Sequence, residues 1–423
     1  MSGDLYGVEQ HLRQEIEQVY SNTLEELLNE VGQSRAFKKR LVAYHEPHEV
    51  GDFRLRTTSL QVQNGHWIKY KSYYARFRTG GISGHLSRAY WGIEKGSSLA
   101  YRSLLSAFSV ITMSFAVGLT LLNLVGIRST KSRMRDLSIS LAKSGLEQGD
   151  TLLLEESESL NGKRVVIGYD GGRCRLREDT GKRNKQGNRC YQTPWREPKV
   201  MVIQVLDESG NLERKYHLPL YLATMRNTKK AMERLAKILK ALDIQQAEHI
   251  QFIADGAQSI WSNIMNIFRK LGLNFAKITM TLDYYHAVQH LNVLIGLLPQ
   301  EEKHQIVFKT YKQWLWKGKV NEIITDFKQR IRKVKQKLCK DMKRELNYFR
   351  KHRHRVNYSS YKRRKLLCGS GLVESTVRRV VNLRFKGTSC FWKKENLEGL
   401  LLLRCAFLAG RWSNLLNVNK LRL

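Results

Sequence analysis

Several features of secreted or disordered proteins are missing from this sequence. It has only five prolines and no low-complexity tract, which argues against long disordered segments. Its six cysteines include no CxxC pair and no zinc-ligand spacing, so they predict free thiols in a reducing, cytoplasmic compartment. No basic segment followed by an apolar core opens the chain, so we expect no signal peptide. A chain of 423 residues predicts about two to four domains.

Acidic residues are also scarce. Lys and Arg number 73 against 38 Asp and Glu, a formal net charge of +35. Such an excess repels itself unless an anionic partner compensates for it. Nucleic acid is the favoured partner, because basic side chains release counterions from a polyphosphate; the alternative is a merely soluble basic surface. Residues 301–366 hold 22 Lys or Arg against six Asp or Glu, which makes them the principal candidate for a DNA-facing surface.

Charge is absent altogether from residues 103–127, which lie between Arg102 and Arg128. A stretch of this length could span a bilayer. It contains seven Ser, Thr or Asn residues, however, a polar load unusual for a single anchor. Buried helices are therefore favoured, and we expect no membrane contact.

The first 150 residues divide into two predicted regions. Residues 1–99 combine a helical segment with a small β-hairpin, because an Asn64-Gly65 step separates two β-type runs. Residues 100–150 resemble a helix-turn-helix, with a turn at Gly126 and a cap at Thr130. Its second helix would present basic residues to DNA: Lys131, Arg133 and Arg135. An ordinary helical hairpin is the alternative.

Residues 160–286 alternate strands and helices, so we expect a compact α/β domain with a mixed sheet. The predicted strands are 164–169, 199–206, 215–222, 249–254 and 276–282, and the predicted helices are 228–242 and 257–271. A basic loop, residues 173–196, separates the first two strands.

The rest of the chain predicts helices. Residues 287–366 are expected to form an all-helical basic region, and residues 367–423 the C-terminal helices of the α/β domain. An apolar seam at spacings of three and four supports a helix within the basic region: Val320, Ile324, Phe327, Ile331, Val334 and Leu338.

Two predicted strands end in an aspartate followed by glycine. They deliver Asp170 and Asp255 to the edge of the sheet, where two neighbouring carboxylates would suit a hard divalent cation. A third strand ends in Asp283, followed closely by His286. Each aspartate taken alone could be a turn former, and His286 could be a histidine bonded within the core beside Asp283.

A fourth acid lies at the start of a later helix. Ser370 is a natural N-cap, and Glu374 follows it beside a buried face that contains Val373 and Val377. The helix dipole alone would favour a glutamate there. The combination of strand-end aspartates, a helical glutamate and strong positive charge is more specific than any one of them.

With these segments, the chain resembles insertion-sequence DDE transposases of the Kra-type family, which have a ribonuclease-H-like catalytic core. The matching segments run in order from about residue 165: Tyr169-Asp170-Gly171-Gly172-Arg173, Trp195-Arg196-Glu197-Pro198-Lys199, Phe252-Ile253-Ala254-Asp255-Gly256-Ala257, Leu282-Asp283-Tyr284-Tyr285-His286-Ala287, Gly369-Ser370-Gly371-Leu372-Val373-Glu374-Ser375, Asn382-Leu383-Arg384-Phe385-Lys386-Gly387 and Gly410-Arg411-Trp412. Residues 1–100 match far less clearly.

The resemblance implies a catalytic triad of Asp170, Asp255 and Glu374 that binds two Mg²⁺ ions, with Mn²⁺ as an alternative ion. Asp283 and His286 match an accessory motif between the second and third acids, and the region between those acids would be an all-helical insertion. Further basic residues would grip DNA phosphates: Arg173, Arg378, Arg379, Arg384 and Lys386.

The implied activity is the binding of terminal inverted repeats of an insertion sequence, with cleavage and strand transfer at its ends. The partners would be the element's ends and target DNA, and synapsis of two ends favours a homodimer or a larger assembly near the nucleoid. Two alternatives are a ribonuclease-H-like nuclease that cuts without joining, and a transposon-derived DNA-binding protein without catalytic activity.

Overall fold

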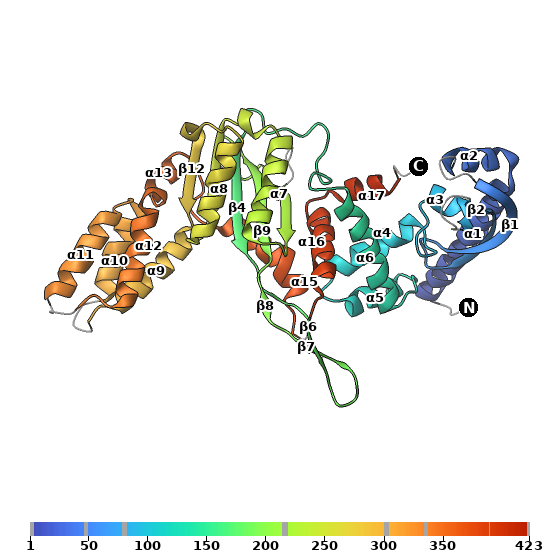
Figure 1. Ribbon diagram of the computed structural model, residues 1–423, viewed down its shortest axis with the longest axis horizontal. Helices are drawn as coiled ribbons and strands as arrows, with labels where there is room; N and C mark the ends of the chain where they lie inside the picture. Colours follow the sequence, from blue (N-terminus) through green and yellow to red (C-terminus); the bar gives the residue numbers. More distant parts are fainter. Residues whose placement is uncertain are drawn as a thin grey trace. The chain divides into compact units, whose positions relative to one another are not determined.

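The computed structural model describes residues 4–45, 50–77, 83–213, 219–299, 304–333, 337–388 and 390–420 (Figure 1). The chain divides into two compact units. The first comprises Met1–Leu153 with Leu402–Leu423, and the second comprises Leu154–Leu401. This division falls within one helix, α16 (Lys394–Leu408), whereas the sequence analysis placed all of residues 367–423 with the α/β domain.

The first unit begins with the expected helices and hairpin. Helices α1 (Leu5–Gln33) and α2 (Arg35–His45) precede an antiparallel sheet of β1 (Val50–Gln61), β2 (Trp67–Phe77) and β3 (Ser83–His85). The Asn-Gly turn is present, with φ +85° at Gly65. Asn29 of α1 bonds the backbone of β2 at Lys69 and Lys71, which fixes the helix along this strand.

The uncharged stretch forms two separate helices. After α3 (Leu86–Tyr90) come α4 (Leu99–Ile111) and α5 (Phe115–Leu124), and residues 112–114 interrupt them. Leu105 and Leu122 are fully buried, whereas Met113 and Leu124 are about 70% exposed. Among the described residues, no helix has the length and apolarity that a membrane crossing requires.

The expected succession of helix, turn and helix is present, with α5 as the first helix. Gly126 has φ +76°, a conformation that glycine adopts without strain. The Thr130 hydroxyl then accepts the backbone N–H of Arg133 and caps α6 (Lys131–Glu147). Two segments distant in sequence complete this unit, the end of α16 and α17 (Trp412–Lys420).

The second unit is built on a mixed five-stranded sheet. Its strands are β4 (Arg164–Gly171), β9 (Lys199–Leu206), β10 (Leu220–Thr224), β11 (His249–Ala254) and β12 (Ile278–Leu282). Their order is β10-β9-β4-β11-β12, with β4, β11 and β12 parallel and β9 antiparallel to both its neighbours. The mixed α/β class and the positions of β4, β9 and β11 agree with the sequence prediction. Strand β10 ends at Thr224, two residues beyond the predicted end, and β12 begins only at Ile278, because Phe275–Lys277 forms a 3-10 turn. Residues 214–218, which include the start of the expected strand 215–222, lie outside the described residues.

The basic loop between β4 and β9 is an ordered hairpin. Two short pairs replace the expected loop: β5 (Cys174–Arg175) with β8 (Trp195–Arg196), and β6 (Glu178–Arg183) with β7 (Arg189–Gln192). In Figure 1 the β6–β7 pair extends away from the main sheet of its unit.

Helices cover the sheet. Helices α7 (Thr228–Ala241) and α8 (Gln258–Lys270) match the prediction and lie side by side in Figure 1. Short 3-10 turns lie at Ile244–Gln246, Phe275–Lys277 and Arg353–Arg355. Helix α14 (Gly371–Val377) packs on β4 and β9, then continues through a π-helical turn (Arg378–Asn382) into α15 (Leu383–Phe385).

The predicted helical insertion follows β12. It contains α9 (Tyr284–Gly296), α10 (His304–Trp316), α11 (Val320–Lys333), α12 (Lys340–His352) and α13 (Tyr358–Arg363). The seam residues of α11 are buried, namely Val320, Ile324, Phe327 and Ile331. The helix ends before Leu338, and Val334 lies outside the described residues.

Gly168 allows α14 to approach the sheet. A β-carbon at this position would lie 2.9 Å from Cβ of Val373 and 3.0 Å from Cγ1 of Val202. Both neighbours are buried, so neither side chain can move without disturbing the core.

We expect Gly168→Val to lower the free energy of unfolding by about 1–3 kcal/mol, because the added side chain overpacks the contact with Val373. Urea denaturation of the purified protein measures this change. Gly296→Ala is the control, since a β-carbon there meets nothing within 4 Å. Equal stability of Gly168→Val and the unsubstituted protein would contradict this account of α14.

Candidate active site

Three aspartates form a row at one edge of the sheet. In the parallel register, Ala254 of β11 pairs with Tyr169 of β4 and with Leu282 of β12. The next residue of each strand is an aspartate, so Asp255 lies between Asp170 and Asp283 along this edge. The prediction that these strands deliver their acids to one edge is therefore confirmed by the register.

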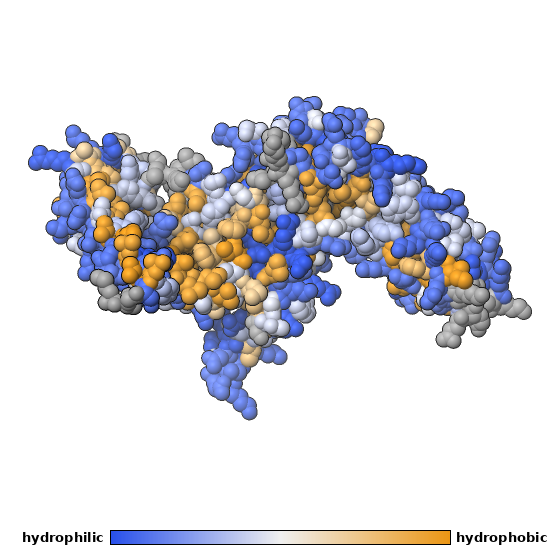
Figure 2. Space-filling model, turned by 180° about the vertical axis from the view of Figure 1, so that it is seen from behind, coloured by the Kyte–Doolittle hydropathy of each residue, from blue (hydrophilic) through white to orange (hydrophobic). Residues whose placement is uncertain are grey.

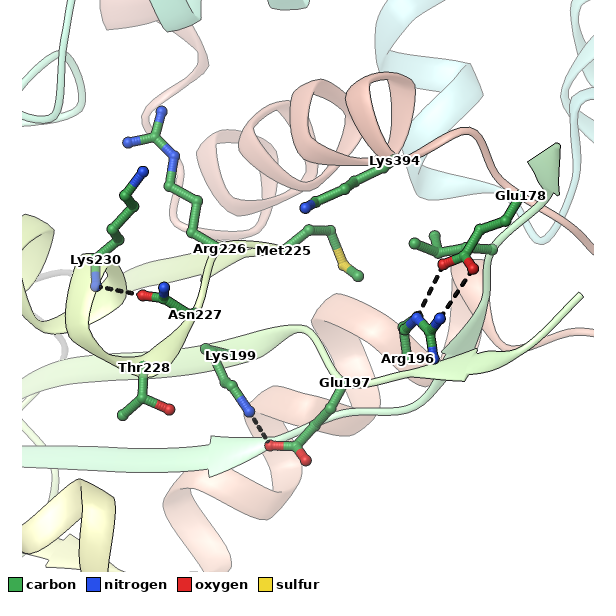
Figure 3. Close-up of a pocket in the computed structure, with 11 residues that line it drawn as sticks. Glu178, Arg196, Glu197, Lys199, Met225, Arg226, Asn227, Thr228, Lys230 and Lys394 are labelled. Carbon is green, nitrogen blue, oxygen red and sulfur yellow. Dashed lines mark hydrogen bonds and ion pairs between the residues drawn. The ribbon is translucent and has the colours of Figure 1, made fainter. Parts of the chain in front are cut away.

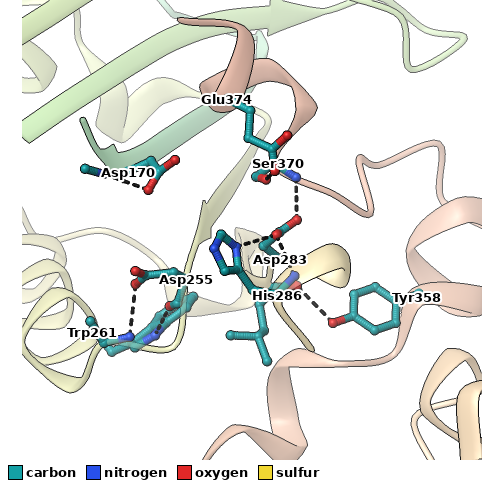
Figure 4. A network of polar contacts seen from close by, with 11 residues as sticks. Asp170, Asp255, Trp261, Asp283, His286, Tyr358, Ser370 and Glu374 are labelled. Carbon is teal, nitrogen blue, oxygen red and sulfur yellow. Dashed lines mark hydrogen bonds and ion pairs between the residues drawn. The ribbon is translucent and has the colours of Figure 1, made fainter. Parts of the chain in front are cut away.

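Glu374 reaches the same region from α14. Its neighbour Val373 packs on Gly168, two residues before Asp170, which brings the first turn of the helix to the end of β4. Figure 4 shows the carboxylates of Asp170, Asp255 and Glu374 around a common space, with the His286 ring between Asp255 and Glu374. Asp170 and Asp255 are partly buried, and Glu374 is exposed.

Asp283 is oriented differently from the other acids. Its side chain is completely buried. One carboxylate oxygen accepts the backbone N–H of Ser370 at 2.6 Å. The other accepts the backbone N–H of His286 at 2.9 Å and lies 2.6 Å from Nδ1 of the same residue. Asp283 therefore positions its neighbours.

A short chain of hydrogen bonds links Asp283 to Glu374. Ser370 donates its backbone N–H to the Asp283 carboxylate and its hydroxyl to Oε1 of Glu374, the latter at 2.7 Å. Its carbonyl also accepts the backbone N–H of Glu374 at 2.7 Å. The loop before α14 is thus fixed to the end of β12, and sequence reasoning had identified Ser370 only as a helix cap.

The electrostatics follow from this arrangement. Burial raises the pKa of Asp170 to about 6; the Gly171 N–H and the His286 charge lower it, and the charges of Asp255 and Glu374 add to the rise. At Asp283, burial raises the pKa, but hydrogen bonds from His286 and Ser370 outweigh it and leave the pKa below its usual value. The Asp283 hydrogen bond raises the pKa of His286; burial opposes this, and the charges of Asp170 and Asp255 add to it.

The donor atoms suit a hard cation such as Mg²⁺, because all three acids offer carboxylate oxygens. Burial is the main cause of the raised pKa of Asp170, and the charges of Asp255 and Glu374 add to it; a divalent cation would relieve this repulsion. Across the described ranges, however, no three His, Cys, Asp or Glu side chains are close enough together to hold a metal ion. The acids face one space without converging on one point.

Helix α8 and the helical insertion both support the Asp255 loop. The Trp261 indole N–H donates to the Asp255 carbonyl at 2.7 Å, and the His352 ring bonds the Gly256 carbonyl at 3.1 Å. A β-carbon on Gly256 would lie only 2.1 Å from the Tyr348 ring, so this ring packs directly on the glycine. Both Tyr348 and His352 belong to α12, and the sequence offered no signal for their role beyond the glycine.

Glu197 lies against Gly171, the residue that follows Asp170. A β-carbon on Gly171 would lie 2.3 Å from Oε1 of Glu197, so this carboxylate rests against the residue after Asp170. Glu197 also pairs with Lys199 at 2.5 Å. In the sequence, both residues stand out only as part of the family segment 195–199.

A basic pocket of about 570 Å³ adjoins this pair (Figure 3). Five cationic residues line it against two acids: Arg196, Lys199, Arg226, Lys230 and Lys394 against Glu178 and Glu197. Glu398 anchors one wall, since its carboxylate accepts from the Thr224 hydroxyl and from the Met225 N–H, both at 2.6 Å. An anionic ligand would fit this excess of positive charge.

The predicted DNA-binding residues of this unit differ in exposure. Arg173, Arg378 and Lys386 are exposed. Arg379 is partly buried and donates to the Tyr221 hydroxyl at 2.8 Å. Arg384 corrects the prediction, because it is only 2% exposed and lies over the Trp392 ring, where DNA does not reach it.

The three residues of α6 differ in the same way. Lys131 and Arg135 are exposed, and Arg135 pairs with Asp136 at 2.8 Å. Arg133 is partly buried: its Nε donates to Gln61 at 3.2 Å and its guanidinium lies near the Trp67 ring. Of these three residues, Lys131 and Arg135 are therefore the ones fully presented on the surface.

No protein-family model matches the chain, and no curated protein matches it. Among solved structures, the chain is similar to the Drosophila P element transposase strand transfer complex at 12% identity and a TM-score of 0.27. The match covers 75% of this chain and 80% of the other. A TM-score this low does not define a shared fold, so a functional interpretation has to rest on the residues themselves.

We expect Asp283→Asn to lower the free energy of unfolding by about 1–3 kcal/mol, because an amide cannot accept from both Ser370 and His286 and leaves a buried N–H unpaired. Urea denaturation measures the loss, and an NMR titration should show the pKa of His286 falling. Ser370→Ala is the control, since it keeps the backbone N–H that Asp283 accepts. An unchanged His286 titration would contradict the assigned hydrogen bond.

Acid should destabilise the fold through His352. Burial and the nearby Arg355 charge lower the pKa of this buried histidine to about 4, against 6.5 in the unfolded chain, while the Gly256 hydrogen bond opposes them. Because the unfolded chain takes up the proton first, stability falls as pH drops from about 6.5 to 4. Relative to His352→Gln, the protein should lose on the order of 3 kcal/mol between pH 7 and pH 4. A stability difference that does not change with pH would contradict the shift.

Proposed function

We propose that this protein is a DDE-type DNA transposase that cleaves the ends of its element and joins them to target DNA. The observation that supports the proposal is that Asp170 and Asp255, from two adjacent strand ends, and Glu374, from one helix, face one common space (Figure 4). The net charge of +35 supports a DNA substrate. The mixed sheet and the helical insertion before Glu374 are in keeping with the ribonuclease-H-like core that the Kra-type resemblance implies.

Asp170, Asp255 and Glu374 would hold Mg²⁺ through their carboxylate oxygens. When bound, Mg²⁺ would promote deprotonation of the attacking hydroxyl and stabilise charge on the departing 3′ oxygen. Carboxylates that repel each other are well suited to this task, because binding removes the repulsion. The raised pKa of Asp170 means that it must lose its proton before it can serve as a ligand.

The remaining residues of the site position these acids. Asp283 holds Ser370, which holds Glu374, and α12 of the insertion holds the Asp255 loop. Nδ1 of His286 bonds Asp283, so the other ring nitrogen, Nε2, would be the one to bond a DNA oxygen. The raised pKa favours its protonated form, which would attract a phosphate.

The proposed reaction has two steps that use the same acids. In the first, a water oxygen attacks phosphorus, the bond from phosphorus to the 3′ oxygen breaks, and a 3′-OH is released at the element's end. In the second, that 3′-OH attacks a target phosphodiester, and the target's own 3′ oxygen leaves. Each attacking hydroxyl loses one proton and each leaving oxygen gains one. In the second step one phosphodiester bond breaks and one forms, so their number is unchanged.

DNA contacts would come from the exposed cations. Arg173, Arg378 and Lys386 would bind phosphates close to the acids, and the basic helical insertion would bind further phosphates along the DNA. Residues 100–145, with Lys131 and Arg135, would bind the terminal repeat. Two ends must meet before joining, so we propose that at least two copies of the chain act together.

Asp170→Asn and Glu374→Gln should each reduce Mg²⁺-dependent cleavage by about 10³-fold or more, because each removes a metal ligand and several kcal/mol of transition-state stabilisation. Binding to the same DNA should change little, since neither residue is a cation. The measurement is cleavage of a plasmid that carries the coding sequence with its native flanks, beside a gel-shift assay.

Glu248→Gln is the matched control. Glu248 is an exposed carboxylate at the opposite end of β11 from Asp255, so its loss should leave cleavage unchanged. Full cleavage by Asp170→Asn would refute the triad. Incubation with pre-cleaved ends and target DNA separates a transposase from a nuclease that cuts without joining, because only the transposase produces joined strands.

A further inference from the structure

The β6–β7 hairpin, residues 178–192, projects from the second unit (Figure 1). It forms a two-stranded sheet of its own, separate from the main sheet. A β-carbon added at Gly181 or at Gly187 would meet nothing within 4 Å. Figure 2 shows a hydrophilic projection where Figure 1 places this hairpin. An isolated hairpin is marginally stable in water. We call residues 178–192 the arm.

The outer part of the arm is strongly basic. Residues 180–189 are all exposed and carry four cations and no acid: Lys182, Arg183, Lys185 and Arg189. Arg183 and Arg189 are direct partners across the two strands. Like charges placed opposite each other destabilise a strand pair. Asp179 pairs with Arg189 at 3.4 Å, and the remaining cations favour a partner that supplies negative charge.

The tip is nevertheless ordered. The Asn184 side chain accepts the backbone N–H groups of Gln186 and Asn188, and Arg183 donates to the Gly187 carbonyl at 2.7 Å. Within the described part of the chain, the Lys182 and Lys185 side chains form no ion pair. The arm thus holds its free lysines on a defined turn.

The base of the arm is fixed to the core. The Arg175 guanidinium lies over the Trp195 ring at 4.8 Å, and that of Arg177 over the Tyr191 ring at 3.6 Å. Arg196 makes two bonds of 2.9 Å to the Glu178 carboxylate. Backbone bonds from Arg177 to Trp392 and back to Arg175 tie the base to the segment before α16. A rigid base with a free basic tip is suited to reaching a partner.

The arm leaves the sheet beside the acids. It connects β4, which carries Asp170, to β9, which begins at Lys199, and Gly171 pairs with Lys199 in the register. The basic pocket lies at its base and includes Glu178 and Arg196. DNA bound with a phosphate at Asp170 would therefore pass close to the arm.

We propose that the arm enters the major groove of duplex DNA next to the reacting phosphate, with Lys182, Arg183 and Lys185 on the groove's phosphates. This rests on the proposed function, which places DNA at Asp170. The groove, about 12 Å wide, admits a two-stranded β-ribbon. The six residues of β6 span roughly 20 Å, enough to cross it.

The test compares a charge-removing variant, K182A/R183A/K185A, with a charge-retaining one, K182R/R183K/K185R. Affinity for a mixed-sequence duplex of about 30 base pairs is measured over a range of salt concentrations. Each lost phosphate contact lowers the slope of log K against log salt by about 0.9, so the first variant should lower it by about 2–3. The second should keep the original slope. Thermal unfolding should match for all three proteins, because the substituted side chains are exposed and lie in the outer part of the arm, away from its base.

An unchanged slope of log K against log salt for the charge-removing variant would overturn the proposal. An equal loss of slope with single-stranded DNA of the same sequence would also overturn it. A photocrosslinker at Lys185 gives a second readout, and it should label duplex DNA next to the cleavage point. The cleavage assay keeps the two proposals separate. Cleavage that depends on Asp170, with an unchanged slope, would refute the arm alone. A reduced slope without any cleavage would refute the transposase alone.

Discussion

The buried carboxylate of Asp283 is the interaction on which the rest of the site depends. It accepts a bond from Ser370 and bonds twice to His286, and so it joins the end of β12 to the loop that carries Glu374. A fully buried charge is costly unless each of its oxygens is paired. Here both are paired, and the depressed pKa of Asp283 shows that these bonds outweigh the burial.

Close backbone contacts complete the assembly. Gly168 admits α14 to the sheet, Gly256 admits Tyr348, and Gly171 admits Glu197. In each case a missing β-carbon lets a side chain of a distant segment lie beside an acid or beside the strand that carries one. The acids are thereby held by contacts from α14, from the helical insertion and from the segment before β9.

Much of this could be predicted from the sequence. Short apolar runs that end in Asp170, Asp255 and Asp283 identify the strand ends, because this signal is local. Ser370 lies at the N-cap position of α14 as predicted, but its hydroxyl bonds Glu374 and makes no capping bond to the backbone. The role of Asp283 could not be predicted, since periodicity does not reveal which of three equivalent strand ends points inward. Nor could the burial of Arg384: its aromatic neighbour Trp392 lies beyond the turn, and charge alone predicts exposure. The basic loop proved to be a hairpin, because its pairing lacks the apolar alternation by which strands are recognised.

The separation of the acids along the chain has a consequence for folding. The bond from Asp283 to Ser370 closes a loop of 87 residues, and Glu374 follows Asp255 only after the whole helical insertion. Contacts of such sequence separation form late, because the chain entropy of closing the loop must be lost before the bond is gained. Asp170 and Asp255 can meet while the insertion is still unfolded. Glu374 is separated from both by the whole insertion, so the closure of this longer loop is expected to bring it to the same edge later.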